Sequence, residues 1–203
     1  MVYLIGVAHR IQKFGDWNTL NEGQVELVEA IRNCIERFRP RVIAEEHSLE
    51  ALGESHSIAK RVADEYKLEH RFCDPDSDWR KRACYKGRDQ LEMEIFTHSW
   101  DVPASEIICG RAGAIERVMY FPVRERYWLE CLADVLAQDD LFICGQAHIE
   151  SFSQLLRSEG VEVTILAERI GVNAEDDRLM ALARDYLEVH PDPIKDEPGV
   201  GNL

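Results

Sequence analysis

The short motif Gly-x-x-His occurs twice in this sequence, each time where an apolar run ends. Residues 6–9 read Gly-Val-Ala-His after the run 2–5, and residues 145–148 read Gly-Gln-Ala-His after the run 141–144. Histidine gains or loses a proton near neutral pH and is the commonest metal ligand in proteins. One such histidine is more often a packed or surface residue, but the paired occurrence indicates acid–base or metal chemistry.

Both motifs are placed where an open α/β sheet binds its ligands, which is at the carboxyl ends of its strands. Glycine lets the backbone turn sharply there because it has no Cβ. We therefore expect Gly6 and Gly145 to form turns that direct His9 and His148 into one crevice.

Two adjacent carboxylates, Glu45 and Glu46, follow the apolar run 42–44. Side chains alternate along a strand, so at most one of the two faces a given side, and the sequence leaves open which one. A solvated strand end is the other interpretation. Because consecutive βα units tend to be neighbours in a sheet, we expect one of these carboxylates beside His9. A carboxylate between two imidazoles can bind a divalent metal or orient a histidine as a base, and the predicted metal ligands are His9, Glu45 and His148.

Three further residues are candidates for the same site. Arg124 stands near the start of an expected helix, where its charge could bind a carboxylate or stabilise an oxyanion; an exposed arginine paired with Glu125 or Glu130 is the alternative. Asp74 ends a short strand, within an Asp-Pro-Asp sequence that is also common in turns. His47 is a possible additional ligand. The sequence has no P-loop, Gly-x-Gly-x-x-Gly, Gly-x-Ser-x-Gly or His-Glu-x-x-His motif.

Length and charge restrict the possible partners. The chain has 203 residues and a formal net charge of −14, which disfavours nucleic acid and anionic membranes. No apolar stretch approaches the roughly 20 residues of a membrane span. The six cysteines include no Cys-x-x-Cys pair, and no signal peptide is recognised, so we expect a cytoplasmic protein.

Strands and helices alternate along the chain, which predicts an α/β fold with a mainly parallel central sheet flanked by helices. Asn21 and Gln24 form a possible capping box for a helix over 22–38. We expect one α/β domain over 1–190, a helical insertion or cap over 79–121, and a loosely ordered tail over 191–203. The other expected strands are 41–46, 68–73, 141–144 and 161–166, and the other long helices are 122–138, 149–159 and 173–189.

The ordered set of motifs resembles the superfamily that contains TraB/PrgY pheromone-shutdown proteins, Tiki proteases, ChaN-like haem-binding lipoproteins and erythromycin esterases. The resemblance rests on residues 6–9, Glu45 or Glu46, Arg124 within Val-Arg-Glu-Arg-Tyr-Trp, and residues 145–148. It spans about residues 2–166, and residues 79–121 have no counterpart in it.

The resemblance implies a hydrolase that cleaves a peptide, amide or ester bond in a small-molecule or peptide substrate through two histidines, a glutamate and an arginine. Tiki-like members are described as metal-dependent peptidases, which implies Mn, Co or Zn here, whereas the esterases are thought to activate water through histidine. The alternative is a non-enzymatic protein that binds haem or a small ligand in the same crevice, as ChaN-like members do.

Overall fold

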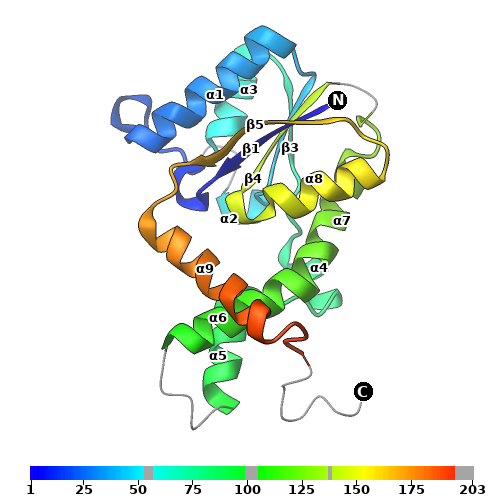
Figure 1. Cartoon of the computed structure of the whole chain (residues 1–203). Coiled ribbons are helices and arrows are strands. Elements are labelled where there is room, and N and C mark those ends of the chain that lie inside the picture. The colour runs from blue at the N-terminus through cyan, green and yellow to red at the C-terminus, as the bar shows by residue number, and fades with distance from the viewer. Residues whose placement is uncertain (53–56, 99–104, 137–138, 195–203) are drawn as a thin grey trace. The chain divides into compact units, whose positions relative to one another are not determined.

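The computed structural model of the chain describes residues 1–52, 57–98, 105–136 and 139–194 (Figure 1). The chain divides into two compact units. The first unit consists of residues 1–79 and 124–172, and the second of residues 80–123 and 173–203. All candidate site residues lie in the first unit.

The first unit contains a five-stranded sheet in which every strand pair is parallel, so the predicted α/β class is confirmed (Figure 1). The strand order across the sheet is β3-β2-β4-β1-β5. The strands are β1 (Val2–Val7), β2 (Val42–Glu45), β3 (Glu69–Phe72), β4 (Asp140–Gly145) and β5 (Val163–Ile170).

The strand β4 lies between β1 and β2, which corrects the expectation that β1 and β2 are neighbours. It hydrogen-bonds to β1 along one edge and to β2 along the other. All six of its residues are buried, as a central parallel strand requires. The carboxyl ends of β2, β4 and β1 therefore follow one another across the sheet, and each precedes one of the candidate residues Glu46, His148 and His9.

Helices cover both faces of this sheet, and alternate strand residues pack on opposite faces. Tyr3, Ile5 and Ile43 pack with α1 (Glu22–Phe38) and α3 (Ile58–Tyr66), whereas Leu4 and Phe142 pack with α7 (Phe121–Leu132) and α8 (Ile149–Ser158). The predicted capping box starts α1, since Asn21 accepts from the Gln24 N–H and Gln24 accepts from the Asn21 N–H. The short helices α2 (Leu49–Leu52) and α4 (Ser77–Arg82) lie in the loops after β2 and β3.

The second unit is helical, and its helices are α5 (Arg88–His98), α6 (Ser105–Ile115) and α9 (Ala174–Val189). Its small core contains Leu91, Ile95, Ile108, Ala112 and Ile115. Residues 116–120 form a π-helical stretch between α6 and α7. Most of the tail predicted to be loosely ordered, residues 195–203, lies outside the described residues. No helix among the described residues is long and apolar enough to cross a membrane.

Candidate functional site

His9 lies in a 3₁₀ turn (His9–Ile11) directly beyond β1, and its side chain is 50% exposed. Its Nδ1 is 3.1 Å from Gln12 Oε1. Because an amide oxygen only accepts, this contact favours the tautomer with the proton on Nδ1. The unprotonated Nε2 then lies 3.5 Å from Glu46 Oε1, beyond the usual range of an N–H···O hydrogen bond.

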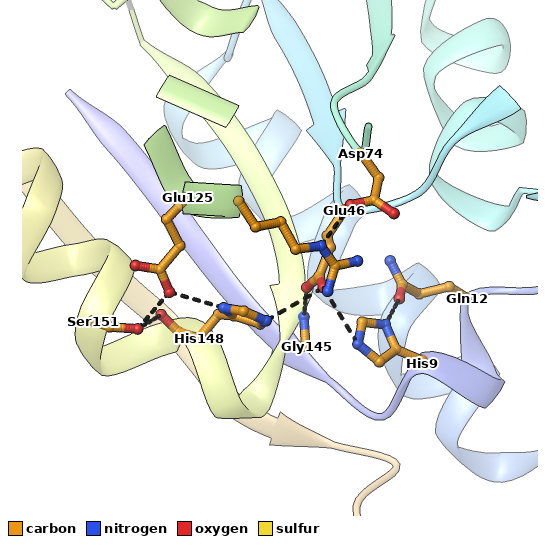
Figure 2. A network of polar contacts seen from close by, with 9 residues as sticks. His9, Gln12, Glu46, Asp74, Glu125, Gly145, His148 and Ser151 are labelled. Carbon is orange, nitrogen blue, oxygen red and sulfur yellow. Dashed lines mark hydrogen bonds and ion pairs between the residues drawn. The ribbon is translucent and has the colours of Figure 1, made fainter. Parts of the chain in front are cut away.

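His148 ends a 3₁₀ turn (Gln146–His148) directly beyond β4, but its side chain is only 3% exposed. Its Nδ1 is 2.8 Å from Glu125 Oε1, which also accepts a hydrogen bond from the Ser151 hydroxyl at 2.5 Å. Its Nε2 is 3.5 Å from Glu46 Oε1, as in His9. The two histidines therefore face the same carboxylate oxygen from opposite sides, one exposed and one buried (Figure 2).

Glu46 is the centre of this network and is fully buried. Arg124 Nη1 lies 2.6 Å from its Oε1, and the Gly145 backbone N–H donates to its Oε2 at 2.5 Å. Burial alone would raise the pKa of Glu46, but the charge of Arg124, followed by the effects of His9, His148 and the Gly145 N–H, lowers this pKa to about 2. Glu46 is therefore an anion at neutral pH.

Arg124 bridges two carboxylates instead of facing open solvent. Its Nε donates to Asp74 Oδ1 at 2.6 Å, so Asp74 lies at the site edge as predicted from its place after β3. The guanidinium carbon is 5.3 Å from the centre of the Trp128 ring, which packs on His148 at 4.7 Å. With two carboxylates on it, Arg124 acts here as the counterion of Glu46.

Glu45 lies apart from the two histidines, although it was included in the predicted metal ligands. Its Oε1 accepts from the Ser57 hydroxyl and is 2.9 Å from His70 Nε2, and all three side chains are buried. Alternation along β2 puts Glu45 on the same face as Ile43, which packs toward α1 and α3. The predicted set is corrected at this position, because Glu46 and not Glu45 lies next to His9 and His148.

The two motif glycines serve close packing more than turning. A Cβ on Gly145 would lie 2.6 Å from His9 Nε2 and 3.3 Å from Glu46 Oε2. Since Gly145 ends the strand between β1 and β2, its missing side chain leaves the space in which His9 and Glu46 meet. A Cβ on Gly6 would collide with the Glu168 carbonyl oxygen of β5 and would lie 2.6 Å from Ile149 Cγ1.

His47 lies next to His9, with the two rings edge to face and their centres 5.9 Å apart. Burial lowers its pKa, so the imidazole stays neutral at neutral pH. Two buried nitrogens beside His9 have no hydrogen-bond partner among the described residues, Nε2 of His47 and Nε2 of Gln12. Such atoms are available to hydrogen-bond a polar ligand at His9.

The sequence interpretation missed three residues of the network, Gln12, Glu125 and Ser151. Gln12 and Ser151 each stand three residues after a motif histidine, and residues at i and i+3 lie on one side of a 3₁₀ turn or of an α-helix, which is where Ser151 lies. That shared spacing was a usable signal. Glu125 was considered only as a partner of Arg124, and its contact with His148 depends on how α7 packs.

The arrangement does not fit a metal ion. Among the described residues, no group of three or more His, Cys, Asp or Glu side chains could hold one. At this site the reason is Arg124, whose Nη1 already contacts the Glu46 oxygen that both imidazoles face. A divalent cation bound to that oxygen would be repelled by the guanidinium charge.

A scan of protein-family models finds none that matches the chain, and searches of curated proteins and of solved structures find no significant match. The resemblance to the TraB, Tiki and erythromycin esterase superfamily therefore stays a prediction.

Proposed function

We propose that this chain is a hydrolase that cleaves a peptide, amide or ester bond with His9 as its general base. The observation that carries the proposal is the position of one exposed imidazole against a buried, ionised carboxylate. His9 Nε2 lies 3.5 Å from Glu46 Oε1, and Glu46 is held ionised by Arg124. The resemblance to a superfamily that includes peptidases and esterases agrees with this reaction class.

In the proposed reaction, His9 Nε2 removes a proton from a water molecule as the water oxygen attacks the substrate carbonyl carbon. The positive charge that develops on His9 is stabilised by Glu46, while Gln12 holds Nδ1 and fixes the orientation of the ring. The tetrahedral intermediate then collapses, and the imidazolium returns its proton to the leaving amine or alcohol. The products are a carboxylic acid and that amine or alcohol.

His148 and Glu125 are positioning residues in this scheme, because neither is exposed enough to touch a substrate. His148 Nδ1 lies 2.8 Å from Glu125 Oε1 and its Nε2 lies 3.5 Å from Glu46 Oε1, so the two carboxylates fix the orientation of the ring. No step requires a metal ion.

The test is a hydrolysis screen on the full chain in excess EDTA, with p-nitrophenyl esters, aminoacyl anilides and fluorogenic peptides as substrates. We expect turnover of at least one class that falls by about 10²-fold or more in His9→Ala, the range for loss of a general base. The control is His190→Ala, because His190 stacks on Tyr186 in the second unit and has no part in the network.

Activity that His9→Ala leaves unchanged would contradict the proposal. Activity that requires added Mn, Co or Zn would show that the reaction depends on a metal and would contradict the metal-free step. Circular dichroism of each variant shows whether its fold is intact.

A further inference from the structure

Two cysteines lie in contact beside the candidate site without belonging to it. Cys73 directly follows β3 and is fully buried, whereas Cys131 is on α7 and is partly exposed. Cys131 packs against the buried cluster of side chains that contains Cys73, and the two thiols interact with each other. The Arg71 guanidinium also donates to the Cys131 carbonyl at 3.0 Å, which fixes β3 against this turn of α7.

The two sulfurs differ in their acidity. The hydrogen bond from Cys73 and a second one from the Tyr127 hydroxyl lower the pKa of Cys131 to about 7, although burial opposes this. The same contact with Cys131, together with burial, raises the pKa of Cys73 well above its usual value. At neutral pH the pair therefore presents one thiolate with access to solvent and one thiol behind it, which are the properties of a reactive and a resolving cysteine.

Three other cysteines with resolved shifts differ from Cys131. Burial raises the pKa of Cys34 to about 12, that of Cys144 well above its usual value, and also that of Cys109. None of the three provides a thiolate at neutral pH, so the lowered pKa depends on the environment of Cys131.

We propose that Cys131 and Cys73 form a reversible disulfide when the protein meets a peroxide. The Cys131 thiolate attacks one peroxide oxygen and breaks the O–O bond, which gives a sulfenic acid on Cys131 and releases water or an alcohol once the leaving oxygen takes up a proton. The Cys73 sulfur then attacks the Cys131 sulfur, its thiol proton leaves with the departing hydroxide as water, and the disulfide forms. The two thiols are oxidised by two electrons, and the peroxide is reduced by two.

The disulfide would link the two segments that hold the ion pair between Asp74 and Arg124. Asp74 is the residue after Cys73, and Arg124 lies seven residues before Cys131 on the same helix. Because Cys131 packs against the cluster that contains Cys73, the two side chains lie together in the folded chain, as disulfide formation requires. Oxidation therefore fixes the loop after β3 to α7, and a thiol reductant releases it.

The test treats the reduced full chain with one equivalent of hydrogen peroxide, alkylates the remaining thiols, and maps tryptic peptides by mass spectrometry. We expect a cross-linked peptide that contains Cys73 and Cys131, two hydrogens lighter than the sum of its parts and lost after dithiothreitol. In Cys73→Ser we expect dimedone to trap a sulfenic acid on Cys131. In Cys131→Ser no cross-link to Cys73 should form.

Cys84→Ser is the matched control, because Cys84 is exposed and lies in the second unit; it should leave the cross-link unchanged. The pH dependence of Cys131 alkylation is measured on the unmutated chain, so no substitution can affect folding. The alkylation rate should reach half its maximum near pH 7. Oxidation of Cys84 while Cys131 stays reduced, or alkylation of Cys131 with a midpoint above pH 9, would overturn the proposal.

Discussion

The adjacent residues Glu45 and Glu46 are both buried, but the sheet directs them to opposite faces and into different surroundings. Glu45 contacts Ser57 and His70 on the face covered by α1 and α3, and all three side chains are closed off from solvent. Glu46 contacts Arg124, Gly145 and two histidines, one of which is half exposed. Chemical type and burial therefore do not distinguish a candidate catalytic carboxylate from a structural one, whereas the neighbours do.

The groups in contact with the two carboxyl groups also differ. The Glu45 network offers a hydroxyl and an imidazole, and it has no arginine or lysine in the contacts described. The Glu46 network offers a permanent cation and a backbone N–H, and the pKa of Glu46 falls to about 2. The surroundings of Glu46 therefore keep its carboxylate ionised. This negative charge suits the stabilisation of the positive charge that develops on His9.

The largest predicted difference between the two networks is in catalysis. Glu46→Gln should lower the hydrolysis rate by about 10²- to 10³-fold, because it removes the anion that stabilises protonated His9. Glu45→Gln should keep the rate within about threefold and lose stability instead. Rates on the same substrate, with unfolding monitored by circular dichroism, measure both; equal losses of rate in the two variants would remove the distinction.

The second difference concerns the cation. Arg124→Met should destabilise the protein by about 3 kcal/mol, because it leaves Glu46 buried and without its main counterion. Addition of Glu46→Gln should recover part of that loss. Arg126→Met is the matched control on the same helix, since Arg126 pairs with Glu159 at the surface, and it should cost less than about 1 kcal/mol. Urea denaturation gives the three values, and a similar cost for both arginines would contradict the account.

The third difference concerns acid stability. The pKa of Glu46 is lowered in the folded protein from 4.5 to about 2, so its contribution is present above pH 4.5 and is lost as the pH falls toward 2. The unfolding free energy of the unmutated chain should therefore fall across this window by a few kcal/mol more than that of Glu46→Gln. Urea midpoints between pH 3 and 6 test this, and parallel curves for the two proteins would be the contrary result.

The last difference is between the two motif glycines. Gly145→Ala should cost about 1 kcal/mol in stability, because the half-exposed His9 side chain can move, but it should lower activity since His9 is displaced from Glu46. Gly6→Ala should cost more, about 3 kcal/mol, because it meets the backbone of β5. Gly15→Ala is the control, as nothing lies within 4 Å of the added methyl group. A larger loss of stability in Gly145→Ala than in Gly6→Ala would show that the glycine roles are reversed.

Local patterns in the sequence predicted local structure well. The capping box at Asn21 fixed the start of α1, and Asn173 caps α9 as expected, because both depend only on contacts within one helical turn. The parallel sheet followed from the alternation of strands and helices. The strand order did not, since the return of β4 to the middle of the sheet depends on contacts between distant segments.

The sequence predicted the site residues that are placed by the ends of the strands. It did not predict those that are placed by the packing of side chains and helices. His9, Arg124, His148 and Asp74 meet because strand ends and α7 bring them together. The choice of Glu46 over Glu45 depends on the phase of strand alternation, which a four-residue strand does not reveal. Glu125 depends on the rotation of α7, which sets which of its residues face β4.

The ionisation of Glu46 is the central claim, and a ¹³C NMR titration of the glutamate side-chain carboxyl groups tests it most directly. The Glu46 signal is identified by its loss in Glu46→Gln. The account predicts a midpoint near pH 2 in the unmutated chain and a clear rise in Arg124→Met. A midpoint at or above 4.5 in the unmutated chain would contradict it, because Glu46 would then lack the stabilised negative charge that His9 requires.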